Sequence, residues 1–95
     1  MDNMVQVTTD SGYVCSINRE AMDDMRIMDA LIDLQNGTKM EQVTALRTIL
    51  DRMLGEKQKE LLYKHLEDKE GRAGMGMVQR ELLDIFTKIG KTGKK

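Results

Sequence analysis

Few side chains in this sequence could take part in chemistry. It holds one histidine, His65, and one cysteine, Cys15, among 95 residues. A zinc site needs about four such ligands converging on one ion, and a nucleophilic site needs a base beside the attacking side chain. Cys15 has apolar neighbours that favour a structural role, and His65 falls in an amphipathic segment where it can meet solvent or pack at an edge. We therefore predict no catalytic residue, no metal site and no cofactor, so the chain is not expected to be an enzyme.

Two sequence patterns are similar to known binding motifs but do not match them. Four aspartates between Asp23 and Asp33 resemble a set of oxygen ligands, but their spacing is not that of an EF-hand loop, which also requires a glycine and a terminal glutamate. Gly90 and Lys91 resemble the end of a phosphate-binding loop, but Ile85 stands where that loop needs its first glycine. The aspartates are better interpreted as the polar face of a helix, and Gly90 as a helix end.

The first element that the sequence predicts is a β-hairpin over residues 4–17. Residues 5–9 and 13–17 are rich in β-branched and aromatic types at alternating positions, and residues 10–12 (Asp-Ser-Gly) supply a turn with a glycine that can take positive φ. Because an isolated hairpin is marginal in water, its apolar face must pack on the helices or on another subunit.

Asn18 is a suitable N-cap for the first helix, whose apolar residues form one arc. Asp24 would fall inside that arc, where a carboxylate is poorly placed. We therefore expect the helix to break near Met22 and to restart with Asp23 or Asp24 as its cap. The arc consists of Ala21, Met25, Ile27, Met28, Leu31, Ile32 and Leu34.

The clearest helix boundary follows Gly37, which ends the first helix. Thr38 and Glu41 then form a capping box that begins the second. Gly55 should end the second helix, and a third should follow at once and close at Gly71. The predicted buried stripes are Met40, Val43, Leu46, Ile49, Leu50, Met53 and Leu54 in the second helix, and Gln58, Leu61, Leu62 and Leu66 in the third.

The remaining sequence predicts a linker, a last helix and a tail. Residues 70–76 contain three glycines and should form the flexible linker. A helical pattern over residues 78–90 follows, and residues 91–95 should be a frayed basic tail. The predicted fold is a single domain over residues 1–95, mainly α, with the hairpin followed by about four short helices within residues 18–90.

Composition narrows the class of protein. With 40% hydrophobic and 33% charged residues, the chain is neither disordered nor membrane-embedded in type, and no apolar run approaches the roughly 20 residues of a bilayer span. Its start has no secretion signal, so we expect a soluble protein that stays in the cytoplasm and does not act at a membrane. Lysines crowd the C-terminal end without interleaved aromatic residues, which makes nucleic-acid binding an unfavoured interpretation.

Nine methionines are unusual in 95 residues. Met22, Met25 and Met28 could form a plastic surface for partner helices or could simply pack in the core, and the sequence leaves both open. Met22 lies beside the apolar arc and is the one most expected to be exposed. The candidate partner-binding residues are Met22, Met25 and Met28, with Leu82 and Phe86 on the last helix.

The order of these motifs resembles the tail assembly chaperone family of long, non-contractile-tailed bacteriophages and prophages. The resemblance spans residues 13–89 and is carried by short motifs at residues 17–25, 28–31, 54–58, 65–68 and 71–72. This chain departs from the family pattern at two positions, with Met25 in place of an aromatic residue and Asp29 in place of a glutamate. The positions that shape the fold in this pattern are Asp23, Asp24, Leu54, Gly55, Gln58, Gly71 and Arg72.

The resemblance implies a function without catalysis. Such chaperones bind the long tape measure protein, keep it soluble and help to recruit tail tube subunits before they leave the finished tail. It implies a homo-oligomer in the cytoplasm of the bacterial host that is absent from the mature virion. The alternative is a small helical DNA-binding regulator, although no helix carries the polar, basic face of a recognition helix.

Overall fold

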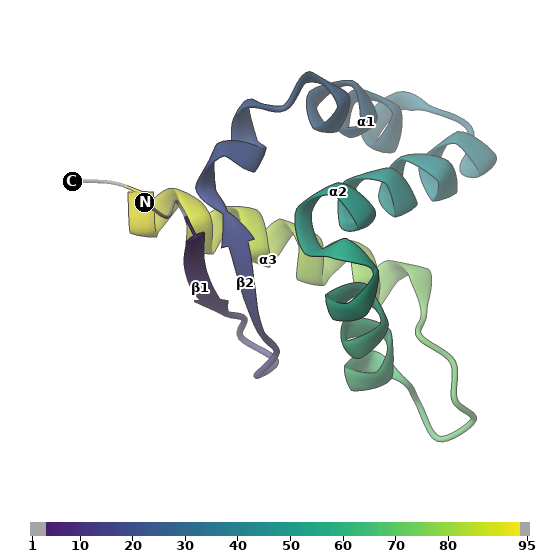
Figure 1. Ribbon diagram of the computed structural model, residues 1–95. Helices are drawn as coiled ribbons and strands as arrows, with labels where there is room; N and C mark the ends of the chain where they lie inside the picture. The colour runs from purple at the N-terminus through teal and green to yellow at the C-terminus, as the bar shows by residue number, and fades with distance from the viewer. Residues whose placement is uncertain (1–3, 94–95) are drawn as a thin grey trace.

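Two strands, a short 3-10 turn and three α-helices follow one another along the chain (Figure 1). This computed structural model describes residues 4–93, and the side chains of residues 4–90. The elements are β1 (Met4–Thr8), β2 (Val14–Asn18), η1 (Arg19–Asp23), α1 (Met25–Asn36), α2 (Lys39–Leu66) and α3 (Met75–Gly93). The predicted mainly α class with an N-terminal hairpin is confirmed. The expected number of about four helices is slightly too high, because the predicted second and third helices form one bent element, α2.

The hairpin forms where the sequence predicts it. β1 and β2 pair in antiparallel fashion with Gln6 opposite Ser16, and burial alternates along both strands. The turn is closed by the Thr9 N–H, which donates to the Tyr13 carbonyl oxygen at 2.9 Å, and Gly12 takes the positive φ of 96°. The inward side chains are Val5, Val7, Cys15 and Ile17, all of which belong to the core.

The passage from the hairpin into α1 follows the predicted break and restart. The side chain of Asn18 accepts a hydrogen bond from the Glu20 N–H at 2.8 Å and so caps η1. Asp24 then caps α1 by accepting from the Arg26 N–H at 2.9 Å, and it pairs with Arg52 Nε at 2.8 Å. Asp24 is thus the cap that begins α1, because its short carboxylate reaches the first free N–H groups of the helix.

The capping box at the start of α2 is also confirmed. The Thr38 N–H donates to Glu41 Oε1 at 2.9 Å, and the Glu41 N–H donates to Thr38 Oγ1 at 3.2 Å. Each side chain satisfies a backbone donor that the helix itself leaves free. The chain therefore turns directly from α1 into α2, and the two helices lie side by side (Figure 1).

α2 changes direction at Gly55, whose φ of 79° and ψ of 164° lie outside the helical region. Residues with a Cβ avoid this region, although nothing lies within 4 Å of the position that a Cβ would take. Glycine is therefore needed for its backbone conformation and not for space. We call residues 39–54 the first limb and residues 56–66 the second limb of α2, and Figure 1 shows the sharp bend between them.

The core lies where the hairpin, α1, both limbs of α2 and α3 meet. β1 packs on α3 and β2 packs on α2. Each large apolar side chain withdrawn from water stabilises the fold by roughly 1.5–3 kcal/mol before the entropy cost is counted. The fully buried ones are Ile17, Ile27, Ile49, Leu50, Leu62, Leu82 and Ile85.

Three predicted helix boundaries near the C-terminal end are wrong: the end of α2, the start of α3, and the end of α3, which continues past Gly90. α2 ends at Leu66 and not at Gly71, which lies in the following loop with a φ of 80°. The loop ends the helix early because the Asp68 side chain accepts hydrogen bonds from the Glu70 and Arg72 N–H groups, at 2.8 and 3.0 Å. α3 begins within the predicted linker, at Met75, and continues to Gly93; residues 94–95 of the predicted tail lie outside the described part of the chain.

Within residues 4–93, no helix combines the length and the apolar character needed to cross a bilayer.

Candidate functional site

Cys15 and His65 have structural surroundings. Burial, and secondarily the nearby charge of Glu81, raise the pKa of the Cys15 thiol to about 11, which keeps it protonated near neutral pH. His65 is exposed, and its Nε2 lies 3.1 Å from both Ser11 Oγ and the Ser11 carbonyl oxygen. Its ring centroid is 5.9 Å from that of Tyr13. Cys15 is therefore part of the core, and His65 helps to hold the hairpin against the second limb of α2.

The predicted aspartate group is spread over two elements. Asp24 is engaged by Arg52 and the α1 backbone, and the hydrogen bond from Arg52 is the main reason that its pKa lies below the usual value. Asp23 is exposed at the end of η1, while Asp29 and Asp33 line a hollow between α1 and the first limb. Among the described residues, no three His, Cys, Asp or Glu side chains are placed to hold a metal ion.

Gln58 has the most specific role of the predicted fold residues. Its Nε2 donates to the Ser16 and Leu54 carbonyl oxygens, each at 2.9 Å, and its Oε1 accepts from the Ser16 N–H at 2.9 Å. The Gln58 carbonyl oxygen also accepts from the Tyr13 hydroxyl at 2.7 Å, and burial raises the pKa of that hydroxyl. Gln58 therefore pairs with the outer edge of β2 as a neighbouring strand would, which protects that edge.

The other predicted fold residues lie at the bend of α2 and in the loop between α2 and α3. Leu54 is buried directly before Gly55, so the bend leaves it in the core. Arg72 is exposed, and its Nη2 lies 2.8 Å from Glu70 Oε1 within the same loop. The contacts of Arg72 are thus local and fit the role in shaping the fold that the resemblance implies.

The candidate partner-binding residues divide into three groups. Met25 is 67% exposed, whereas Met22, Met28 and Phe86 are partly buried against the core. Leu82 is fully buried, so its prediction as a contact residue is wrong for this chain. The prediction that Met22 would be the exposed methionine is also wrong, because the 3-10 turn and the restart at Asp24 change the phase of the buried arc.

A groove lies between the two limbs of α2 and the start of α3. We call it the α2–α3 groove; its volume is about 440 Å³. Its floor is apolar and its rim is charged, and it exists because the bend at Gly55 turns the second limb away from the first. It is lined by Val43, Leu46, Tyr63, Ala73, Met75 and Val78, with Arg47, Glu60, Glu67 and Gly71 around them.

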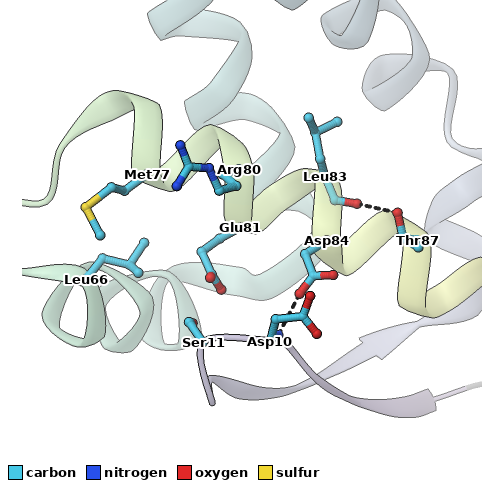
Figure 2. A pocket seen from close by; sticks show the side chains of 9 residues that line it. All are labelled: Asp10, Ser11, Leu66, Met77, Arg80, Glu81, Leu83, Asp84 and Thr87. Atoms are coloured by element: carbon cyan, nitrogen blue, oxygen red, sulfur yellow. Dashed lines mark hydrogen bonds between the residues drawn. The ribbon is translucent and has the colours of Figure 1, made fainter.

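A second concave site, of about 540 Å³, lies between the hairpin turn, the end of α2 and α3 (Figure 2). We call it the Glu81 hollow. The Asp10 N–H donates to Asp84 Oδ2 at 2.7 Å, and Lys88 Nζ lies 2.7 Å from Asp84 Oδ1 and 2.9 Å from Asp10 Oδ1. These contacts tie the turn to α3. The lining residues are Asp10, Ser11, Leu66, Met77, Arg80, Glu81, Leu83, Asp84 and Thr87.

Glu81 is the unusual side chain of this hollow. It is only 7% exposed, and its Oε1 is buried with no hydrogen-bond partner in the described part of the chain. Sequence reasoning missed it, although a signal was present: Glu81 lies on the apolar stripe of α3, three residues after Val78 and four before Ile85. A carboxylate in such a stripe either finds a partner or costs stability.

Comparisons of this chain with protein families, with curated proteins and with solved structures found no match.

Proposed function

We propose that this chain is a tail assembly chaperone of a long, non-contractile-tailed bacteriophage or prophage. In this role it binds the tape measure protein in the host cytoplasm, keeps that protein soluble and promotes assembly of the tail tube, without remaining in the mature virion. The order of sequence motifs supports the family, and the α2–α3 groove is the structural observation that carries the proposal.

The groove fits the chemistry of an amphipathic helix. Such a helix places its apolar face in an apolar groove and its polar flanks near the rim. Val43 supplies apolar surface in the groove and Met75 supplies adaptable apolar surface, while Arg47 and Glu60 offer charges of both signs at its rim. A tape measure protein exposes long apolar helical stretches, which are the segments that need such cover during assembly.

An exposed apolar side chain continues the groove along α2. Met40, one turn before Val43 on the same face of the helix, is 75% exposed. Apolar side chains gathered around a groove mark interaction surfaces more often than isolated ones do. The same surface could serve the tail tube protein, or a second copy of the chain in the homo-oligomer that we propose.

Co-expression with the tape measure protein encoded beside this chain tests the proposal. We expect the wild-type chain to increase the soluble fraction of the tape measure protein, and Val43→Glu to abolish the increase because it places a charge in the groove. Leu61→Glu is the matched control, since Leu61 is 56% exposed and does not line the groove.

Two outcomes would count against this assignment. If the tape measure protein is no more soluble with the wild-type chain than without it, the proposed function is wrong. If Val43→Glu and Leu61→Glu both act like the wild type, the groove is not the binding surface.

A further inference from the structure

The charges around the Glu81 hollow are not balanced within it. Asp10 and Asp84 share Lys88, whose Nζ lies between them. Glu81 has no such cation: within the described residues no Lys, Arg or His nitrogen lies within 4.0 Å of its carboxylate oxygens, and its buried Oε1 accepts no hydrogen bond.

Arg80 precedes Glu81 in α3 but does not neutralise it. Neighbouring residues on a helix point about 100° apart, and Figure 2 shows the two side chains leaving α3 in different directions, with Glu81 directed toward the hairpin turn and the end of α2. Arg80 is exposed, so its charge is solvated. Glu81 therefore lines the hollow with an acceptor atom, Oε1, that residues 4–90 leave without a hydrogen bond.

The residues that line the hollow indicate which chemical class of ligand it can bind. An anion is disfavoured by three carboxylates, and no set of three metal-ligating side chains is present among residues 4–90. Leu66 and Met77 beside Glu81 supply an apolar wall, which suits a methylene stem. The best fit is a cation at the end of an apolar stem, as in a lysine or arginine side chain.

The position of the hollow indicates that the cation belongs to a side chain of a bound polypeptide. Leu83 lines both the Glu81 hollow and a neighbouring hollow at α1, whose other lining residues include Gln42 and Gln79. The two hollows thus share Leu83 on α3, and a chain bound across both can insert one side chain at Glu81.

We propose that the Glu81 hollow binds a lysine or arginine side chain inserted by a partner polypeptide, with the Glu81 carboxylate accepting its hydrogen bonds. Asp10 and Asp84 add negative potential at the rim, and Leu66 and Met77 contact the stem. This assignment stands whichever protein supplies the side chain, so it does not depend on the tape measure protein being the client.

The site is tested first with small probes. The isotope-labelled full chain is titrated with n-butylammonium at constant ionic strength, and amide chemical shifts are followed by NMR, with n-butanol as the uncharged control. We expect saturable shifts at residues 10–11, at Leu66 and at residues 77–87, and none with n-butanol. Equal shifts with both probes, or no shifts, would overturn the proposal.

Variants identify the acceptor. Glu81→Gln should weaken n-butylammonium binding by about tenfold or more, because a desolvated charge pair is lost. Glu56→Gln, a matched change at an exposed glutamate at the start of the second limb, should leave it unchanged. Glu81→Met should weaken n-butylammonium binding by the same factor. This second variant keeps the test decisive if Glu81→Gln folds poorly. Unchanged affinity in the folded Glu81 variants refutes the assignment.

Helical peptides test whether the cation that binds at Glu81 is carried by a polypeptide. Two peptides of about 15 residues, long enough for measurable helicity, differ only in a central lysine or norleucine. The lysine peptide should bind at least about tenfold more tightly than the norleucine peptide and than n-butylammonium, since the flanking helix adds contacts along α3. If n-butylammonium binds as tightly as the lysine peptide, the hollow is a site for small amines and the polypeptide assignment is wrong.

Discussion

Gln58 and Glu81 place polar side chains against the same hairpin from opposite helices, yet their surroundings differ. Gln58 uses its amide oxygen once and its amide nitrogen twice, all at 2.9 Å, whereas Glu81 has a buried oxygen with no partner. A buried polar group that is fully satisfied contributes to stability, and one that is not costs stability. The first residue therefore stabilises the fold, and the second leaves a buried acceptor that, in our proposal, a ligand satisfies.

The largest effect that distinguishes the two residues is expected at Gln58. Gln58→Leu preserves the size of the side chain but removes three hydrogen bonds, so the free energy of unfolding should fall by about 2–4 kcal/mol at roughly 1 kcal/mol for each bond. Urea unfolding followed by circular dichroism measures the change.

Gln42→Leu is the control for that change. Gln42 makes a single side-chain hydrogen bond, to the Leu34 carbonyl oxygen at 3.1 Å, and should lose about a third as much. Equal losses in the two variants would show that Gln58 does not have the special role assigned to it.

Glu81 should respond in the opposite direction. Glu81→Met replaces an unpartnered buried carboxylate by an apolar chain and should raise the free energy of unfolding by about 1–3 kcal/mol. The same urea experiment measures it, with Glu60→Met near zero as the control at an exposed site. A destabilised Glu81→Met variant would mean that Glu81 is satisfied in solution, which contradicts the contrast with Gln58.

The pH dependence of stability tests whether the charge of Glu81 raises the pKa of Cys15. The pKa of Cys15 is raised from 9.0 to about 11 in the folded chain, so folding gains stability from the protonated thiol below pH 9 and loses it as pH rises from 9 to 11. The loss should be about 2 kcal/mol over that range. Cys15→Ala should remove the thiol's part of it, and Glu81→Met should reduce it, because the Glu81 charge is the second cause of the raised pKa.

Urea unfolding at pH 8, 9, 10 and 11 tests that dependence. Tyr13 also has a pKa raised above its ordinary value of 10.0, so its ionisation adds to the fall in stability above pH 10. The same slope in the wild type and in both variants would contradict the assigned cause.

The smallest effect is expected at Asp24. Asp24→Asn keeps a side-chain oxygen for the cap of α1 but loses the charge that pairs with the exposed Arg52, so thermal unfolding should change little. Asp24→Ala loses the cap as well and should be clearly less stable than Asp24→Asn. Similar unfolding temperatures for the two variants would show that capping contributes little here.

The sequence predicts those parts of the fold that depend on adjacent residues. The hairpin turn, the capping box at Thr38 and the restart at Asp24 follow from side chains that satisfy backbone groups two or three positions away. The direction of the bend at Gly55 cannot be predicted in this way, because glycine only permits the conformation and packing of the two limbs selects it.

The candidate site was harder to predict for the same reason. Leu82 is fully buried while its neighbour Leu83 is 60% exposed, and which of the two faces the core depends on where the hairpin packs on α3. The position of Glu81 on the buried stripe is visible in the sequence. The sequence does not show that Glu81 lacks a hydrogen-bond partner, because the partners available depend on how the hairpin turn, about 70 residues earlier in the chain, packs on α3.

The contact between Asp10 and Asp84 has a consequence for the order of folding. These residues are 74 positions apart, whereas α1 and α2 are joined by a two-residue connection and can pair early from local contacts. The Glu81 hollow is complete only when these distant segments are in contact, so we expect it to form after the α1–α2 pair. A cation bound there would therefore stabilise only those chains in which the hairpin turn has packed on α3.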